Sequence, residues 1–186
     1  PEVRESILAA ALRAPTAGNL MLYSILEIED PELKARLAQT CDDQPFIARA
    51  PWVLVFLADW ARAYAFFRHH KVPEWCADKG EAFLRPRESD LLLAACDALI
   101  AAQTAAVAAE ALGLGSCYIG DIMENGDVHR ELLELPPYAF PVTMLCLGYP
   151  TEQQKSRPQT PRLSADLVVN RDRYRQFSAD DFERMY

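Results

Sequence analysis

The sequence lacks several features from which binding or catalysis can be recognised directly. It has no long block of lysine and arginine, and its formal net charge is -8, so nothing in it is suited to follow a nucleic-acid backbone. Its three histidines show no metal-ligand spacing. Phosphate-binding glycine loops and the Gly-x-Ser-x-Gly elbow of hydrolases are also missing. We therefore expect no catalytic side chain and no metal ligand, and an enzyme built on this sequence would depend on a cofactor.

Cysteines are few and badly spaced for cross-linking. No Cys-x-x-Cys occurs, and an odd number of cysteines lie far apart, at Cys41, Cys76, Cys96, Cys117 and Cys146. A disulfide framework or a zinc site is therefore not expected. Free thiols, several of them buried, fit a reducing compartment. The first residues also lack the basic start and apolar core of a secretion signal, so the expected location is the cytoplasm.

What the sequence does contain is enough apolar material for a folded core. Hydrophobic residues make up 51% of the 186 residues, and no long stretch has the composition of a disordered chain. The expected organisation is a single domain over residues 1–186. Within it, residues 151–186 are expected to form an extended, polar, proline-containing arm and a short helix.

Hydrophobic periodicity predicts helices that alternate with strands. Continuous or alternating apolar runs predict strands at residues 23–29, 52–57, 116–119, 141–147 and 167–169. Helical spacing predicts helices at residues 3–13, 31–40, 60–70, 90–112, 125–133 and 179–186. Three of them have an expected N-cap residue: Asp30, Ser89 and Ser178. This mixture indicates a layered α+β or α/β domain in which helices cover a sheet.

The predicted helix at residues 90–112 is the longest, and it is rich in alanine and apolar nearly all round. Its length would suffice to cross a membrane. Asp97, Gln103 and Glu110 interrupt it, however, and alanine is only weakly apolar. We therefore interpret it as a central helix buried by its neighbours, with small side chains that allow close approach in a tight dimer core.

Three segments suggest a bound cofactor, although each also has a plain structural explanation. The loop Pro15–Asn19 has small residues that would let a ligand approach the backbone, but it also serves as a helix-to-strand connection. The segment Gly113–Gly120 has glycines at both ends of a predicted strand, and Gly120 would let a planar ring approach the main chain. Helix termination followed by a tight turn would explain the same glycines. The basic residues after Pro150 form a candidate phosphate clamp or a solvated tail: Lys155, Arg157 and Arg162.

Taken together and in this order, the three segments resemble the nitroreductase family. Arg13–Asn19 is similar to the N-terminal flavin loop of that family, and Gly113–Gly120 to its second flavin segment. Leu147–Pro150, followed by the basic arm and by Leu167–Val169, is similar to its C-terminal pattern. The resemblance implies a nitroreductase-like α+β fold. In that fold a central, mostly antiparallel sheet is flanked by helices, and a long buried helix lies at the interface of an intertwined homodimer.

The resemblance further implies two FMN sites at the subunit interface. It assigns these residues to FMN: Arg13, Pro15, Thr16, Ala17, Asn19, Gln44, Tyr118, Ile119, Gly120, Arg157 and Arg162. Residues of the N-terminal loop would contact FMN that is bound mainly by the other subunit. Gln44 would lie near the flavin ring, and Tyr118 to Gly120 would line the ring near its reactive nitrogen. Arg162, supported by Arg157 or Lys155, would hold the phosphate.

The function implied is an FMN-dependent oxidoreductase with a ping-pong mechanism. NAD(P)H would deliver hydride to the flavin, and a nitroaromatic, quinone or similar acceptor would then take the electrons. Aromatic residues between residues 60 and 86 would shape an acceptor pocket or simply form the local core: Tyr64, Phe66, Phe67, Trp75 and Phe83. The alternative is a non-catalytic homodimer that binds a flavin or related ligand as a sensor or store.

Overall fold

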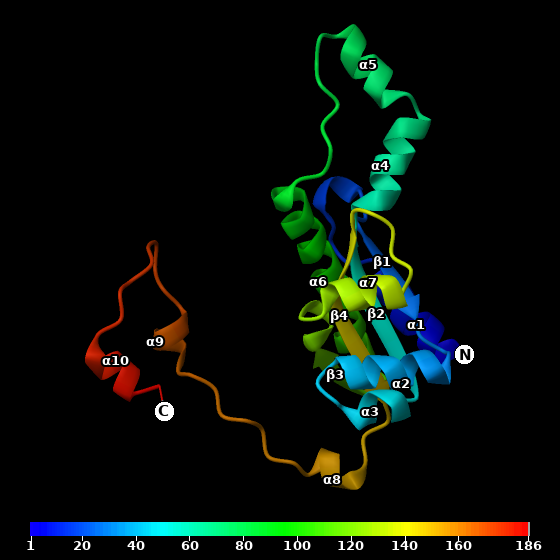
Figure 1. Cartoon of the computed structure of the whole chain (residues 1–186). Helices are drawn as coiled ribbons and strands as arrows, with labels where there is room; N and C mark the ends of the chain where they lie inside the picture. The colour runs from blue at the N-terminus through cyan, green and yellow to red at the C-terminus, as the bar shows by residue number, and fades with distance from the viewer. Residues whose placement is uncertain (186) are drawn as a thin grey trace. The chain divides into compact units, whose positions relative to one another are not determined.

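The computed structural model describes residues 1–185 and divides the chain into two compact units, Pro1–Pro150 and Thr151–Tyr186. The larger unit contains all four strands (Figure 1). The helix expected at residues 179–186 ends at Glu183, and its last predicted residue, Tyr186, lies outside the described part.

One antiparallel sheet organises the larger unit. Its strands are β1 (Tyr23–Glu27), β2 (Trp52–Asp59), β3 (Gly115–Ile119) and β4 (Ala139–Gly148), in the spatial order β1-β2-β4-β3. Every neighbouring pair is antiparallel. All eight residues of β2 are buried, as the continuous apolar run predicts for a strand covered on both faces. The predicted α+β fold with an antiparallel sheet is confirmed.

The register between β2 and β4 shifts next to a proline. Phe56 pairs with Thr143, whereas the next residue, Leu57, pairs with Pro141, so that Val142 is the extra residue. Proline has no backbone N–H to give to a ladder and is tolerated in sheets mainly at bulges or edges. The bulge therefore accommodates Pro141 inside a central strand.

Helices α1 (Glu2–Ala11) and α6 (Glu88–Ala111) cover one face of the sheet. α6 presents small side chains to that face and to α1, which lets its axis lie close to the strands. Its buried alanines are Ala94, Ala98, Ala101, Ala102, Ala105, Ala106 and Ala109. Ser89, the expected cap of this helix, lies inside it. The cap is instead Arg87, because the Asp90 carboxylate accepts the Arg87 backbone N–H at 2.9 Å.

The outward side of α6 is also apolar. Leu92 and Val107 are 68% and 55% exposed, and Leu99 and Ile100 lie between them, with 45% and 41% exposed. The helix is long and apolar enough to cross a membrane by length and composition alone, a description that core helices of soluble proteins also meet. One side of it packs on the sheet, and within the unit Pro1–Pro150 no element covers the other side.

The opposite face of the sheet packs against shorter elements. These are α2 (Pro31–Thr40), α3 (Pro45–Arg49), the 3₁₀ turn η2 (Asp121–Met123) and α7 (Gly126–Leu132). The predicted cap of α2 is confirmed, since the Asp30 carboxylate accepts the Glu32 N–H at 3.0 Å. The sheet thus lies between two helical layers (Figure 1).

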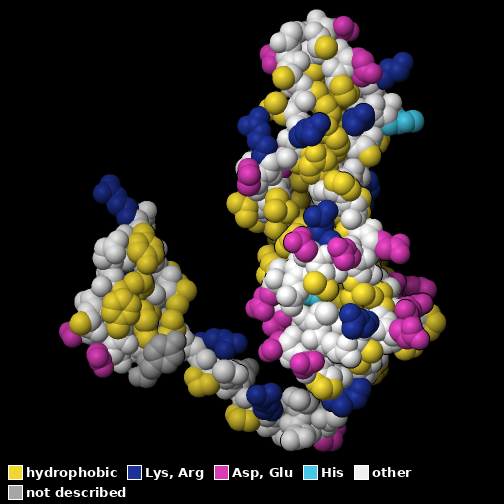
Figure 2. All heavy atoms as spheres, in the orientation of Figure 1, with side chains coloured by type: hydrophobic (Ala, Val, Ile, Leu, Met, Phe, Trp, Pro, Cys, Tyr) yellow, Lys and Arg dark blue, Asp and Glu magenta, His cyan; other side chains and the backbone are white. Residues whose placement is uncertain are grey.

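Residues 60–87 leave the body of the larger unit as an excursion. It consists of α4 (Trp60–His69), α5 (Val72–Asp78) and a segment without regular structure that leads back to α6. Figure 1 shows α4 and α5 extending beyond the end of the sheet, and Figure 2 shows hydrophobic side chains gathered over them. This excursion was the least predictable part of the sequence.

The second unit contains three short helices, α8 (Glu152–Lys155), α9 (Ala165–Val168) and α10 (Ala179–Glu183). The prediction of a strand at residues 167–169 is wrong, because these residues form the turn α9 and its end, which bury Leu167. The prediction that Ser178 caps the last helix is confirmed, since its hydroxyl accepts the Asp181 N–H at 3.3 Å.

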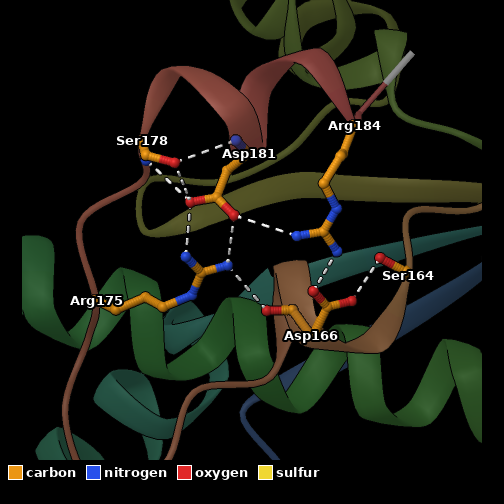
Figure 3. Close-up of polar contacts among 6 residues, drawn as sticks. All are labelled: Ser164, Asp166, Arg175, Ser178, Asp181 and Arg184. Atoms are coloured by element: carbon orange, nitrogen blue, oxygen red, sulfur yellow. Dashed lines mark hydrogen bonds and ion pairs between the residues drawn. The ribbon is translucent and has the colours of Figure 1, made fainter.

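Polar contacts around Asp181 hold this unit together (Figure 3). Arg175 donates to both carboxylate oxygens of Asp181, at 2.8 and 3.2 Å, and Arg184 lies 3.5 Å away. Arg184 also pairs with Asp166, whose other oxygen accepts from Ser164 at 2.7 Å. The Arg175 guanidinium and the hydrogen bonds from Ser178 hold the pKa of Asp181 far below its ordinary value.

Candidate functional site

The loop Pro15–Asn19 has an unusual backbone. Gly18, Asn19 and Met21 all adopt positive φ, at 56°, 56° and 49°. Glycine and asparagine tolerate this conformation, but methionine does so rarely. Pro15 and Asn19 are exposed, while Thr16 and Ala17 are partly buried. Such a strained, accessible loop persists only when other contacts hold it in place.

Asp97 supplies those contacts from the middle of α6. The side chain, 2% exposed, accepts a hydrogen bond from the Thr16 hydroxyl, and from the backbone N–H groups of Ala17 at 2.9 Å and Leu22 at 3.1 Å. The Thr16 hydroxyl also accepts the Met21 N–H at 2.9 Å. A buried carboxylate with three donors fixes the loop rigidly to the central helix.

This role of Asp97 was not predicted from the sequence, in which the residue stands out only as an interruption of an apolar helix. A single carboxylate in an alanine-rich run nevertheless signals a buried charge that needs partners, because an unpaired buried carboxylate is very costly. The signal is therefore present in the sequence, but its partners are not, since they lie 75 to 81 positions away.

Gln44 is placed just before α3 by a second left-handed turn. Asp42 and Asp43 have φ values of 59° and 47°. The Gln44 amide nitrogen donates to the Cys41 carbonyl at 2.8 Å and to the Asp121 carboxylate at 3.0 Å. Both of these partners only accept, so the amide nitrogen must face them. Its two protons are then used, and Oε1 is left as an acceptor for a ligand.

The segment Tyr118–Gly120 comprises the last two residues of edge strand β3 and the glycine that follows it. The Tyr118 side chain is 40% exposed and its hydroxyl donates to Gln103 of α6 at 3.2 Å, whereas Ile119 is buried. A Cβ placed on Gly120 would meet no atom within 4 Å. Nothing within the chain therefore requires glycine at this position, and its backbone borders open space. A flat ligand that approaches the main chain would explain why glycine occupies this position.

The structure brings some of the predicted residues together and separates others. Asp121 directly follows Gly120 and bonds to Gln44, so these two predicted positions lie at one place. The loop Pro15–Asn19 precedes β1, which is the opposite edge of the sheet from β3. Three spacings between neighbouring strands separate β1 from β3, and together they amount to about 14 Å. Within one copy, the two candidate segments are therefore apart.

The remaining predicted residues are exposed and have few partners. Arg13 lies in the turn after α1. Arg157 and Arg162 belong to the second unit, together with Lys155, which pairs with Glu152 at 2.7 Å. Nothing in the structure tests their assignment to a phosphate, so it stays a prediction.

The aromatic residues of the excursion divide into two groups. The Tyr64 and Phe83 rings stack at 5.3 Å, and with Phe67 they line a cavity of about 380 Å³. Phe66 and Trp75 are 58% and 59% exposed. The excursion therefore has neither a single core nor a single pocket made from all five residues.

Two buried cysteines near these segments, Cys41 and Cys146, are unreactive. Burial raises the pKa of the Cys41 thiol to about 11, with help from the nearby negative charges of Asp121 and Glu124. Burial likewise raises the pKa of Cys146 to about 12. Both thiols are protonated at neutral pH, so neither is a nucleophile there.

The chain is similar in sequence to a family of known proteins. The model of the nitroreductase family matches residues 1–149. An oxygen-insensitive NADPH nitroreductase of Salmonella typhimurium is 38% identical over 171 residues, which is 92% of this chain and 65% of the relative. The chain thus spans about two thirds of the length of the curated relatives that it matches.

Solved structures are similar to it over nearly the whole chain. NfrA2 of B. megaterium has a TM-score of 0.85 at 31% identity, covering 98% of this chain and 70% of its own. The NADPH:FMN oxidoreductase of Vibrio harveyi, complexed with NAD+, has a TM-score of 0.81 at 31% identity, covering 98% and 72%. With the family model matched over most of its length and the fold shared with these enzymes, the chain belongs to the nitroreductase family.

Proposed function

We propose that the protein is an FMN-dependent oxidoreductase that takes electrons from NAD(P)H and works as a homodimer. The names of the Salmonella and Vibrio relatives support the cofactor and the electron donor. Nitroaromatic or quinone-like compounds are the proposed acceptors. The reducing cytoplasm, which supplies NAD(P)H and keeps free cysteines reduced, is the proposed location.

The observation that carries this proposal is the arrangement of contacts along α6. Asp97 holds the loop Pro15–Asn19, and Gln103 holds Tyr118 beside Gly120. The two positions are six residues apart, which is about 9 Å along a helix. Their midpoint is Ile100, in the exposed apolar stripe.

A two-fold axis near Ile100 would therefore bring the two candidate segments together. If two copies of α6 cross antiparallel there, Asp97 of each copy lies opposite Gln103 of the other. The loop Pro15–Asn19 of one copy would then approach Gly120 of its partner. Two composite sites would result, each built from both chains, and the exposed leucines of α6 would be covered.

The residues present fit FMN. Gly120 offers open backbone, and Gln44 offers an oxygen that can accept from a ring N–H. Arg157 and Arg162 would hold the phosphate, for which guanidinium groups are well suited. When bound, FMN would supply the electron-transfer chemistry, accepting hydride from NAD(P)H and passing electrons to the acceptor in a ping-pong sequence.

The chain's own residues would bind and orient. Asp97 holds the loop that would contact the flavin of the partner subunit, and Asp121 holds the Gln44 amide nitrogen so that the amide oxygen would be available to the ring. The aromatic cavity around Tyr64 and Phe83 is the proposed place for an aromatic acceptor. Positioning of this kind is the main contribution of a protein to cofactor-borne catalysis.

The test is reconstitution with FMN followed by turnover. We expect the purified protein to retain flavin and to oxidise NADPH with menadione or a nitroaromatic. Arg162→Ala should weaken FMN binding about tenfold, because it removes a charged hydrogen bond to the phosphate. Arg171→Ala, in the same unit, is the control and should leave FMN binding unchanged. Retention of flavin without turnover would favour a sensor or store. Failure to bind FMN would contradict the proposal.

A further inference from the structure

A second cavity, of about 280 Å³, lies at the base of the excursion. It is enclosed where β2 passes into α4, where α6 begins and where β4 begins. Ala58, Trp60 and Phe140 form part of its wall. None of the residues proposed for FMN lines it, so it is separate from the flavin site proposed above. Its volume suits a ligand smaller than most drug-sized molecules.

Arg130, on α7, brings an unpartnered charge to this cavity. Its Nε atom is buried and has no hydrogen-bond partner. Among residues 1–185, no acidic group lies within 4.0 Å of its guanidinium. Buried polar groups are almost always satisfied in folded proteins, and an unsatisfied donor is costly. The cavity therefore lacks an acceptor.

Arg87 and Glu88 complete the charged part of the wall. Arg87 is exposed and, within the described residues, it also has no ion pair. Two guanidinium groups and the Glu88 carboxylate give the site a formal charge of +1. A ligand with one negative charge would balance the site.

Aromatic side chains form another part of the wall, and they are held in place. The Trp60 indole N–H donates to the Asp90 carbonyl at 2.7 Å. The Trp60 backbone N–H donates to the Tyr138 carbonyl at 3.0 Å, and the rings of Tyr138 and Tyr64 meet edge to face at 5.4 Å. Fixed rings beside paired guanidinium groups suit a flat ligand that carries a carboxylate.

We propose that this cavity binds an aromatic monocarboxylate with a single ring. The carboxylate lies between Arg130 and Arg87, and the ring lies against Trp60 and Tyr138. The neighbouring cavity of about 380 Å³ shares Trp60, Pro86 and Arg87 with this one. A substituent on the ring can therefore extend toward the excursion.

The first experiment compares three probes on the wild-type protein by isothermal titration calorimetry. Benzoate has the ring and the charge, benzamide has the ring without the charge, and acetate has the charge without the ring. We expect saturable binding of benzoate, at least tenfold tighter than binding of either control. Equal binding of benzoate and benzamide, or no saturable binding of benzoate, would overturn the proposal without any variant.

The second experiment identifies the residues. Arg130→Met and Arg87→Met should each weaken benzoate binding about tenfold, since each removes a charged hydrogen bond. Arg49→Met, on exposed α3, is the matched control and should leave the affinity unchanged. If Arg130→Met retains the wild-type melting temperature and the wild-type affinity, the assignment is wrong. If that variant does not fold, a crystal structure of the wild type with benzoate replaces it. Absence of the carboxylate from the space between Arg130 and Arg87 would then contradict the proposal.

A third measurement separates this site from the flavin site. The titration with benzoate is repeated with FMN present at saturation. We expect unchanged affinity, because no residue proposed for FMN lines this cavity. Loss of benzoate binding on addition of FMN would place benzoate in the flavin site and refute a separate cavity. A protein that binds benzoate but no FMN would contradict only the proposed function.

Discussion

Two aspartates, one in each unit, organise their surroundings by different means. Asp97 is 2% exposed and accepts only from neutral donors, namely a threonine hydroxyl and two backbone N–H groups. Asp181 is 8% exposed and is held by two arginines as well as by the cap at Ser178. The first fixes a loop to the core of a large unit, and the second holds together a unit with very little core.

These two kinds of contact predict how each unit should respond to salt, acid and substitution. Contacts between a buried carboxylate and neutral donors are little affected by salt, but they are expensive to break because the donors have no other partner. Ion pairs with exposed partners gain less from each contact and depend on pH and salt. We therefore expect the larger unit to be sensitive to substitution at its aspartate, and the smaller unit to be sensitive to acid.

The largest effect should come from Asp97→Ala. The backbone N–H groups of Ala17 and Leu22 would lose their acceptor, and the left-handed loop would lose its anchor. The free energy of unfolding of the larger unit should fall by about 3 kcal/mol. Urea denaturation followed by circular dichroism measures this quantity.

Glu110→Ala is the matched control for that variant. Glu110 is an exposed carboxylate on the same helix, so its loss should change the unfolding free energy by less than about 0.5 kcal/mol. Equal effects of the two substitutions would mean that Asp97 contributes helix charge rather than an anchor. The contrast between the two aspartates would then fail.

Much of the fold could be predicted from local sequence pattern. The apolar run at residues 52–57 predicts a strand that is buried on both faces, and Asp30 predicts a helix start. The strand expected at residues 167–169 failed for a physical reason. Its β-branched residues favour a strand, but a strand needs a partner, and a single turn buries Leu167 instead.

The candidate site was less accessible to sequence reasoning. The loop at residues 15–19 and the glycine at position 120 were found from small residues at turns. The roles of two carboxylates were not found: Asp97 holds the loop, and Asp121 holds Gln44. Their partners lie about 75 to 81 positions away in the chain. A hydrogen bond over such separations depends on the strand order, which the sequence pattern does not specify.

The second prediction is that acid loosens the C-terminal unit. The pKa of Asp181 lies below its ordinary value of 3.8 in the folded unit, because Arg175 stabilises the charged form. Its contribution to stability is therefore fully present above pH 3.8 and is lost as the pH falls through the lower folded value. The pKa of Asp166 is lowered as well, by Ser164 and Arg184, which adds in the same direction.

Amide chemical shifts of Ala179–Glu183, measured by NMR during acid titration, follow this loss. We expect the shifts to stay constant down to pH 3.8 and to change only below it. Arg175→Met should move the change upward toward 3.8, because it removes the main cause of the shift. If Arg175→Met leaves the pH of the change in amide shifts unaltered, the arginine does not hold Asp181.

The smallest expected effect is that of Ser178→Ala, which separates the cap from the ion pairs. The Ser178 hydroxyl accepts the Asp181 N–H at 3.3 Å and donates to its carboxylate at 3.0 Å. Loss of such a cap costs about 1 kcal/mol, so hydrogen exchange in α10 should become about fivefold faster. Ser156→Ala is the control, since the exposed Ser156 hydroxyl donates only to backbone carbonyls of α8. Unchanged exchange in α10 would mean that the arginines alone hold Asp181 in place.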